Sequence, residues 1–386
     1  MDYFLTEEQQ MIKELAARIA DERIKPVAGE LDEKEEFPWD LMKVLADSDL
    51  FAVWVPEEYG GLGGGVFEQA LVVEELSRAC SGVAVSYAAS GLGSFPILMY
   101  GSEEQKKRYM PEIAGGKRLA AFALTEANAG SDVSAIATTA TRDGDEYVLN
   151  GTKQWITNGG EADIYTVIAV TDKTKGPRGA SAFVVEKGTP GLSFGKKEKK
   201  LGIRASATRE VILEDCRIPA DNLLGREGLG FVIAMKTFDK TRPGIGAQAL
   251  GIAQGALDAA VQYARQREQF GQPISSFQGI QFMLADMATQ IEAARALVYS
   301  VAKLVDSGAR DVSKASAMAK LFASDMCMKV TVDAVQILGG YGYMREYPVE
   351  KMMRDAKITQ IYEGTNQIQR NIIALELIKE AARQGK

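Results

Sequence analysis

The spacing of hydrophobic residues divides the chain into three zones, and the first is helical. Over residues 12–19 the apolar side chains follow the 3-4 spacing of one helix face. Thr6 and Ser102 each stand three residues before a glutamine, which is the capping-box pattern at the start of a helix. Pro38 marks a further start, within a first helical turn. The pattern predicts an N-terminal all-helical domain over residues 1–120.

The second zone, residues 121–232, has the short β-rich runs of strands. These runs lie at 147–149, 164–170, 182–185 and 211–213. Turn signals separate them at Asn150-Gly151, Asn158-Gly159 and Pro190-Gly191. Several short strands at this spacing predict a central β-barrel or sandwich domain.

In the third zone, residues 233–386, the helical period returns. Apolar residues keep a 3-4 spacing over 280–305, which predicts one long helix, and a second helix covers 318–330. Gly339-Gly340 is expected to end that second helix as its C-cap. Long helices with short connections are typical of a four-helix bundle. The chain is therefore expected to be an α+β multidomain protein in the order helical domain, β domain, helical bundle.

One uncharged segment, residues 79–102, is long enough to raise the question of a membrane span. Serine, glycine and proline interrupt it throughout, whereas a spanning helix needs about 20 predominantly apolar residues. We expect a buried core helix and no membrane insertion. The first residues are acidic and lack the basic and apolar regions of a signal peptide, so a cytoplasmic protein is expected.

Composition excludes several kinds of chemistry. The chain has no histidine, so a Ser-His-Asp or Cys-His nucleophile and a His-ligated zinc or iron site are excluded, and no metal is expected. Any general base must be a carboxylate, lysine, tyrosine or cysteine. A net charge of −7 argues against nucleic acid as a partner. Three cysteines, an odd number, fit a reducing compartment.

Three segments are candidates for chemistry, each with a plainer interpretation beside it. The small and polar residues of 123–132 form either an ordinary turn or a loop that approaches a flat ring or a phosphate. Residues 155–158 offer an aromatic wall for a planar cofactor. Glu363, between Tyr362 and Gly364, is either a buried base or a solvated loop residue. The glycine-rich stretch 59–65 lacks the context of a Rossmann or P-loop site.

Taken together, these segments resemble the acyl-CoA dehydrogenase family of short- and medium-chain flavoproteins. The segment Leu124-Thr125-Glu126, continued by Ala129-Gly130-Ser131-Asp132, is similar to the first family signature. The segment beginning at Gln336 and Gly339-Gly340 is similar to the second. Further blocks at 155–158, 238–243, 267–271 and 361–365 follow in the family's order. The resemblance covers nearly the whole chain.

This resemblance implies an FAD enzyme that removes the α and β hydrogens of an acyl-CoA thioester to give the trans-2-enoyl-CoA. It implies electron transfer to an electron-transfer flavoprotein and a homotetramer, in which a neighbouring subunit supplies residues 336–340. Glu363 would be the catalytic base. The implied substrate-binding residues are Ser131, Asp239, Arg242 and Gly364. The implied cofactor-binding residues are Phe122, Leu124, Thr125, Gly130, Ser131, Trp155, Ile156, Thr157, Arg267, Gln269, Gln278, Gln336, Gly339, Gly340, Thr365, Asn366 and Gln367.

The resemblance leaves the acyl group open. Some relatives carry the base at the position of Thr241, and threonine is not a base, so Glu363 is the candidate. The segment aligned with the acyl pocket, residues 86–94, is rich in small residues. We expect a short- to medium-chain acyl-CoA, with an alicyclic or branched acyl-CoA as the alternative. A non-enzymatic relative with a basic C-terminal region is the distant alternative, and the acidic pI of about 5.1 opposes it.

Overall fold

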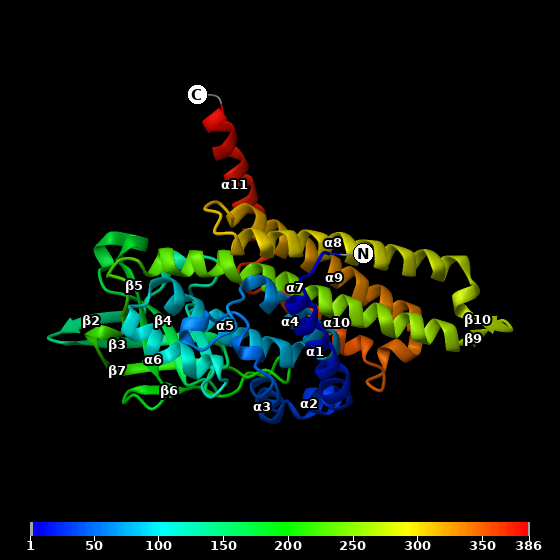
Figure 1. Ribbon diagram of the computed structural model, residues 1–386, viewed down its shortest axis with the longest axis horizontal. Helices are drawn as coiled ribbons and strands as arrows, with labels where there is room; N and C mark the ends of the chain where they lie inside the picture. Colours follow the sequence, from blue (N-terminus) through cyan, green and yellow to red (C-terminus); the bar gives the residue numbers. More distant parts are fainter. Residues whose placement is uncertain (1–2, 385–386) are drawn as a thin grey trace.

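The computed structural model describes residues 3–384, and its N-terminal region is built of helices (Figure 1). The region contains α1 (Glu7–Ile19), α2 (Ala28–Lys34), α3 (Trp39–Asp47), α4 (Val66–Ala79), α5 (Ser81–Tyr100) and α6 (Glu103–Ala114). Thr6 and Ser102 both form the expected capping boxes. Pro38 is the N-cap of α3 and not a residue of its first turn. Without an N–H, proline is tolerated just before the helix as well as in its first turn.

Helix α5 is the expected core helix. It is long and apolar enough to cross a membrane, but 78% of its most apolar window is buried inside the protein. It packs against α4, against the long helix of the C-terminal region and against the first strand. Its glycines and serines allow this close packing from several sides. The helix thus joins the N-terminal region to both other regions.

The second region is one eight-stranded sheet. Its strands are β1 (Ala120–Ala123), β2 (Thr139–Asp143), β3 (Glu146–Thr157), β4 (Ile164–Val170), β5 (Ala180–Glu186), β6 (Leu192–Phe194), β7 (Thr208–Pro219) and β8 (Leu223–Leu224). They lie in the order β6-β7-β3-β2-β4-β5-β8, with β1 paired parallel to β4. All four β-rich runs of the sequence lie within these strands.

One expected turn of this region is wrong. Asn150-Gly151 lies inside β3, where the pairing with β7 shifts register between Leu149 and Gly151 as at a β-bulge. The φ of Gly151 is +149°, and a Cβ there would lie 2.5 Å from the hydroxyl of Thr138. The glycine therefore serves the bulge, and the turn between β2 and β3 lies at Gly144. The expected turns at Asn158-Gly159 and Pro190-Gly191 are confirmed.

The third region is a bundle built along one long helix. It contains α7 (Gly230–Gln266), α8 (Gln278–Asp306), α9 (Ser313–Leu338), α10 (Val349–Thr359) and α11 (Asn366–Gln384), with a small hairpin of β9 (Glu268–Gln269) and β10 (Gln272–Pro273). Helices α8, α9 and α10 pack against α7. Gly339 ends α9 as expected, with φ +60°.

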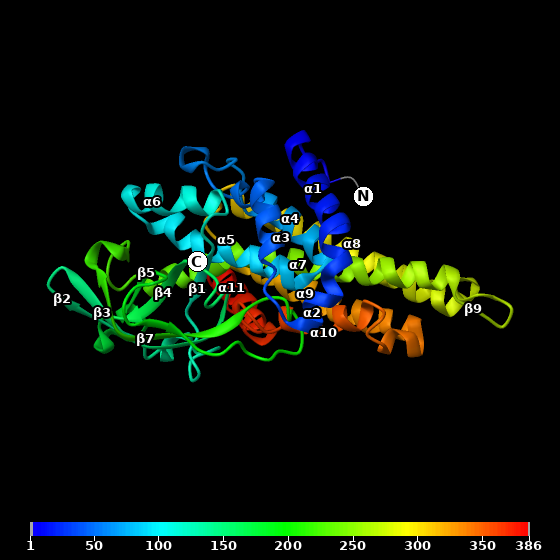
Figure 2. The same cartoon turned by 90° about the horizontal axis from the view of Figure 1, so that it is seen from below.

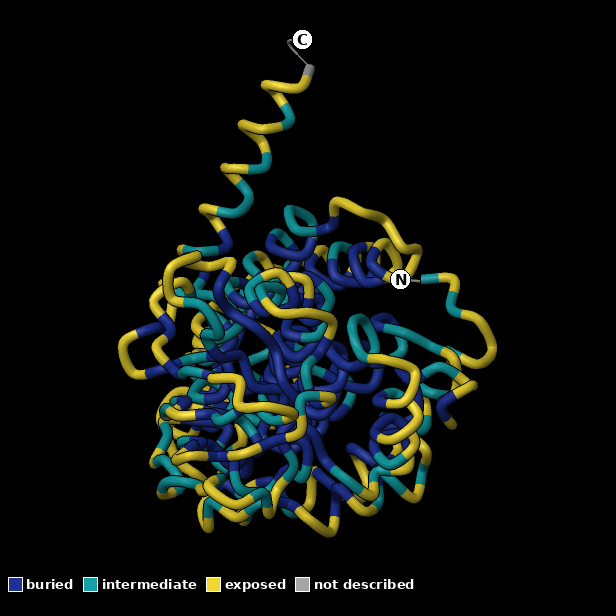
Figure 3. The backbone as a smooth tube through the Cα atoms, turned by 90° about the vertical axis from the view of Figure 1, so that its left-hand side faces the viewer, coloured by how far each residue is buried: buried dark blue, intermediate teal, exposed yellow. Residues whose placement is uncertain are grey.

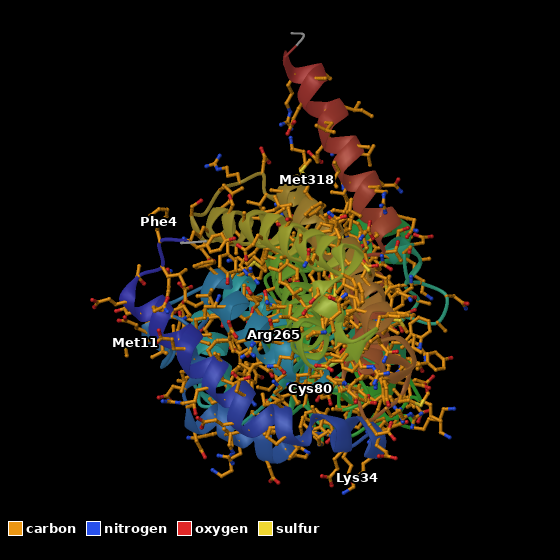
Figure 4. The ribbon with its side chains drawn as sticks, turned by 90° about the vertical axis from the view of Figure 1, so that its right-hand side faces the viewer. Phe4, Met11, Lys34, Cys80, Arg265 and Met318 are labelled. Carbon is orange, nitrogen blue, oxygen red and sulfur yellow. The ribbon has the colours of Figure 1, made fainter. Side chains whose placement is uncertain are left out.

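Helix α7 determines the shape of the molecule. Its 37 residues span about 55 Å, with the sheet at one end and the β9-β10 hairpin at the other (Figure 1). Figure 2 shows the N-terminal helices along one side of α7, and α4 and α5 contact it directly. Figure 4 looks at the hairpin end, where Arg265 is labelled in the last turn of α7. Helix α11 projects from the body (Figure 3).

Candidate active site

A small cavity lies where the three regions meet. Its volume is 130 Å³, and helices α4, α5 and α7, the ends of β1 and β3, and the loop between α10 and α11 all contribute to its wall. The lining residues are Gln69, Val73, Val85, Ala88, Ala89, Leu92, Phe122, Leu124, Thr125, Trp155, Ile156, Thr157, Phe238, Thr241, Gly244, Ile245, Tyr362 and Glu363. Elements far apart in the sequence therefore meet at this one place.

The sheet side of the cavity is built by six of the residues expected to bind the cofactor. Phe122, Leu124 and Thr125 come from the end of β1, and the other three from the end of β3. Trp155 has a φ of +58°, a backbone conformation that a bulky residue rarely adopts and that clusters at functional sites. Its side chain stays 58% exposed at the cavity. The arrangement presents an aromatic face and two threonine hydroxyls to a planar ligand.

An ion pair beneath this surface holds it in shape. Lys153 is fully buried, and its Nζ donates to the carbonyl oxygen of Leu124 at 3.0 Å and to Glu126 Oε1 at 2.7 Å. The Glu126 carboxylate also accepts the backbone N–H groups of Ala137 and Thr138. Burial lowers the pKa of Lys153 to about 8 despite this partner. The pair links β3 to the loop after β1, and no local sequence pattern marks it because its members are 27 residues apart.

Glu363 enters the cavity from the loop between α10 and α11. Its φ is +50° and that of Gly364 is +89°, so two successive left-handed residues turn the side chain inward. Glu363 Oε2 accepts a hydrogen bond from Thr241 Oγ1 on α7 at 2.6 Å. Its backbone oxygen accepts from Gln369 Nε2 at 3.1 Å and faces Arg242 Nε at 3.5 Å. The two positions at which the family carries its base are therefore in direct contact here.

The surroundings of Glu363 adjust its proton affinity. Burial raises the pKa of this carboxyl to about 7, while the Thr241 hydrogen bond and the charges of Arg242 and Lys320 act to lower it. A carboxylate with a pKa near neutrality can accept a proton from a weak carbon acid far better than an ordinary exposed glutamate can. The arrangement is that of a general base.

Lys320, which the sequence analysis did not identify, supports the loop from below. It is fully buried on α9, and its Nζ donates to the Gly364 carbonyl oxygen at 2.9 Å and to Asn366 Oδ1 at 2.8 Å. Burial lowers the pKa of Lys320 to about 7. The Asn366 amide donates in turn to Ser324 and Asp325. Asn366, expected at the cofactor, is only 4% exposed and holds the loop in this structure.

Two residues expected at the substrate, Asp239 and Arg242, are buried beside Glu363. Asp239 accepts hydrogen bonds from Arg242 Nη1 at 3.3 Å and from Ser313 Oγ at 2.6 Å. In this structure both residues support the base from α7. Of the other expected residues, Gly130 and Ser131 lie on an exposed loop after β1, and Gly364, Thr365 and Gln367 lie near the start of α11.

The remaining expected cofactor residues lie at the opposite end of the molecule. Arg267 follows α7, 26 residues after Thr241, which corresponds to about 40 Å along a helix. Its guanidinium lies 5.4 Å from the ring of Tyr341, beside Gly339 and Gly340. Gln269 in β9, Gln278 at the start of α8 and Gln336 near the end of α9 belong to the same end. One chain therefore does not bring the two sets of cofactor residues together.

Family models match almost all of this architecture. The N-terminal domain of acyl-CoA dehydrogenase matches residues 6–117, the middle domain residues 121–216 and the C-terminal domain residues 228–378. The chain belongs to the acyl-CoA dehydrogenase family. The expectation drawn from the sequence motifs is confirmed.

Known proteins from several organisms are similar to this chain. The chain is 50% identical over 381 residues to the acryloyl-CoA reductase (NADH) of Anaerotignum propionicum, covering 98% of this chain and 96% of the relative. It resembles the butyryl-CoA dehydrogenase of Megasphaera elsdenii with a TM-score of 0.95 and 48% identity over 98% and 100% of the chains. A structure from work on the electron-transferring flavoprotein of Acidaminococcus fermentans and electron bifurcation matches with a TM-score of 0.96 and 53% identity, over 98% and 99%.

Membership of the acyl-CoA dehydrogenase family defines the class of reaction and the cofactor. Acyl-CoA dehydrogenases are oxidoreductases that carry FAD and act on acyl-CoA thioesters. The residues present fit that cofactor, since the Trp155 face, the neighbouring hydroxyl groups and a buried base all line one cavity. Phe122, Leu124, Thr125, Trp155, Ile156 and Thr157 are the residues of this chain that would hold the flavin ring.

Proposed function

We propose that the protein oxidises a short-chain acyl-CoA, such as butyryl-CoA, to the trans-2-enoyl-CoA. The observation that carries the proposal is Glu363, a carboxylate turned into the cavity at the junction of the three regions. Ala88 and Ala89 line it from α5, and the likeness to a butyryl-CoA dehydrogenase supports the same size class.

Different residues of the chain carry out different parts of the reaction. Glu363 removes the α-proton onto its carboxylate, and the electron pair of that C–H bond becomes the new bond between the α- and β-carbons. FAD, when bound, supplies the acceptor for the hydride that leaves the β-carbon. Thr241 and Arg242 hold the base in position, and the apolar wall excludes water, which keeps the carboxylate reactive.

We further propose a homotetramer that passes its electrons to an electron-transfer flavoprotein in the cytoplasm. The two sets of cofactor residues lie at opposite ends of one chain, about 40 Å apart along α7, so a second chain would complete the site. Helix α11 leaves the body with Leu375, Leu377 and Ile378 exposed, as at a subunit contact. The likeness to a structure from work on an electron-transferring flavoprotein supports that partner, and three unpaired cysteines support the compartment.

Reduction of a short 2-enoyl-CoA is the second candidate, favoured by the 50% identity to an acryloyl-CoA reductase. The same site would serve, because a carboxyl with a pKa near 7 can donate as well as accept the proton.

The test is the anaerobic flavin bleaching of the purified holoenzyme by acyl-CoAs of four to twelve carbons. Bleaching fastest with butyryl-CoA, and turnover with an electron-transfer flavoprotein at a rate well above peroxide formation, is expected. Bleaching that is fastest with a long chain would contradict the substrate, and steady-state turnover only from enoyl-CoA and a reduced donor would favour the second candidate.

A further inference from the structure

Gly244 of α7 lines the cavity and has open space where a side chain would be. A Cβ at this position would meet no heavy atom within 4 Å among residues 3–384. The glycines that follow it in α7 differ, because a Cβ at Gly246, Gly251 or Gly255 would collide with a neighbouring helix. Close packing therefore explains those glycines but not Gly244, although glycine within a helix is less stable than alanine.

The preceding proline does not account for this glycine either. Pro243 has no N–H to donate to the Asp239 carbonyl oxygen four residues earlier. Ser316 Oγ of α9 donates to that oxygen at 2.7 Å and takes the place of the missing hydrogen bond. The effect of the proline on the helix is thus compensated one turn before Gly244.

Gly244 lies on the face of α7 that is directed toward α4 and α5. Residues four and seven positions later share that face of a helix. Gln248 Nε2 donates to Ser81 Oγ, at the start of α5, at 2.7 Å. A Cβ at Gly251 would collide with the carbonyl oxygen of Glu74 on α4. At Gly244 itself the cavity therefore separates α7 from these two helices.

This space is where the far end of an acyl group would lie. Glu363 removes the α-proton, so the α-carbon lies beside it, and Thr241, three residues before Gly244, donates to Glu363. Trp155 and Thr157 form the side expected to hold the flavin ring, toward which the β-hydride leaves. The carbons beyond the β-carbon are left with the space between α7 and the wall formed by α4 and α5.

We infer that the acyl chain beyond the β-carbon lies between Gly244 and the apolar wall that includes Val73 of α4 and Ala88 of α5, so that the missing side chain at residue 244 sets the largest acyl group that the enzyme accepts. The inference deepens the proposed function and rests on it. Residue 244 would act on the substrate through its volume, since glycine offers no group that reacts or donates from a side chain.

A series of straight-chain acyl-CoAs tests residue 244 in the holoenzyme. Gly244→Ala adds one methyl group to the space, and Gly244→Val adds a larger branched group. One methylene in an apolar pocket changes selectivity by about 10–200-fold. We therefore expect the ratio of kcat/KM for hexanoyl-CoA to that for butyryl-CoA to fall by about tenfold in Gly244→Ala and further in Gly244→Val. An unchanged ratio in both variants would overturn the inference.

Binding without turnover separates the size of the acyl group from its reactivity. Dissociation constants of hexanoyl-CoA and butyryl-CoA are measured by calorimetry on the FAD-loaded Glu363→Gln protein, with and without Gly244→Ala. The added methyl group should weaken hexanoyl-CoA binding by about tenfold and leave butyryl-CoA binding nearly unchanged. Equal weakening of both ligands, or release of FAD, would mean that residue 244 does not face the end of the acyl chain, which contradicts the inference.

Gly29→Ala is the matched control. Gly29 also lies in a helix, α2, and a Cβ there would likewise meet no heavy atom within 4 Å among the described residues, but Gly29 does not line the cavity of Glu363. Both alanine variants should raise the melting temperature, because alanine is the better helix former and neither methyl group collides with a neighbour. Only Gly244→Ala should change the acyl preference. A lower melting temperature in Gly244→Ala would show that the space is filled, against the inference.

A failure of the proposed function would look different in the same experiments. If a long-chain acyl-CoA bleaches the wild-type flavin faster than butyryl-CoA does, the proposed function is contradicted. The comparison of Gly244→Ala with the wild type along the acyl series still tests residue 244 in that case, because the longer acyl groups should lose most.

Discussion

At the scale of single residues, the reactivity of Glu363 depends on groups from three parts of the bundle. Thr241 and Arg242 come from α7, Lys320 from α9 and Gln369 from α11, and each contacts the base or its loop. Burial favours the neutral form of the carboxyl, whereas the hydrogen bond from Thr241 and the two cations favour its ionised form. The balance leaves a base that is half-ionised near pH 7.

Replacement of the base itself should abolish the first step of the reaction. In Glu363→Gln the size of the side chain and its bond to Thr241 are kept, but the proton acceptor is lost. Loss of a general base costs about 10²–10⁴-fold in rate, and we expect the upper end of that range, measured as anaerobic flavin bleaching by butyryl-CoA. Glu30→Gln on the exposed face of α2 is the control. Bleaching at the wild-type rate in Glu363→Gln would place the base elsewhere.

The rate of bleaching should follow the ionisation of Glu363. Its pKa is raised to about 7, and only the deprotonated carboxylate accepts the α-proton, so the rate should rise with pH and level off above that value. In Thr241→Val the hydrogen bond that lowers this pKa is lost, and the midpoint should move to higher pH.

Thr237→Val, one turn earlier on α7, is the matched control for Thr241→Val. The Thr237 hydroxyl is buried and donates to the Ile233 carbonyl oxygen within the helix, away from the base. This variant should keep the wild-type midpoint. An unchanged midpoint in Thr241→Val would mean that the Thr241 hydroxyl does not act on the base.

At the scale of elements, the ends of β1 and β3 form one surface because the Lys153–Glu126 pair joins them. Lys153 donates a hydrogen bond to the Leu124 carbonyl oxygen, and the Glu126 carboxylate accepts hydrogen bonds from two backbone N–H groups that precede β2. The loop that carries Thr125 and the positive φ of Trp155 therefore belong to one rigid unit. Such a unit can present a preformed face to a planar ring.

Breaking this pair should loosen the flavin. Lys153→Met leaves the Glu126 carboxylate buried without its cation, which costs about 3–5 kcal/mol. We expect a lower melting temperature together with weaker retention of FAD, measured by flavin fluorescence on dilution. Lys351→Met is the control, because it breaks another buried pair, with Asp355 on α10. If both variants lose stability but retain FAD equally well, flavin binding by the ends of β1 and β3 does not depend on Lys153.

At the scale of the whole molecule, the length of α7 separates two halves of the expected cofactor site. The end of β3, which carries Trp155, lies toward one end of α7, and the β9-β10 hairpin that follows Arg267 lies at the other (Figure 1). A chain built this way would complete its site by association. The projecting helix α11 offers an apolar surface for that purpose.

Charges on α11 should therefore separate the subunits. The double variant Leu375→Asp and Ile378→Asp places carboxylates at side chains that are 56% and 65% exposed in the single chain. If these residues are buried between subunits, the mass measured by light scattering should fall below four chains and FAD should be released. Lys34→Asp on α2 should leave both unchanged. A wild-type protein that is a monomer and retains its flavin would contradict the assembly.

Much of the architecture follows from the sequence, because it depends on local patterns. Helix and strand periods locate the three regions, and the capping boxes at Thr6 and Ser102 form as expected. The missing histidine reduces the choice of base to a few residue types. Each of these features depends on the backbone and on side chains within a few positions, which periodicity and composition can report.

The working details of the site depend on contacts that only the tertiary structure makes. Asn150-Gly151 has the sequence of a turn, but pairing with β7 keeps it inside a strand. Gln69 and Lys320 are ordinary helix residues in the sequence, and only the packing of α4, α5 and α9 places one beside Gly91 and the other beneath Gly364. The pKa of Glu363 is likewise set by residues 43 to 122 positions away. Burial and electrostatics act through space, so residue order along the chain does not reveal them.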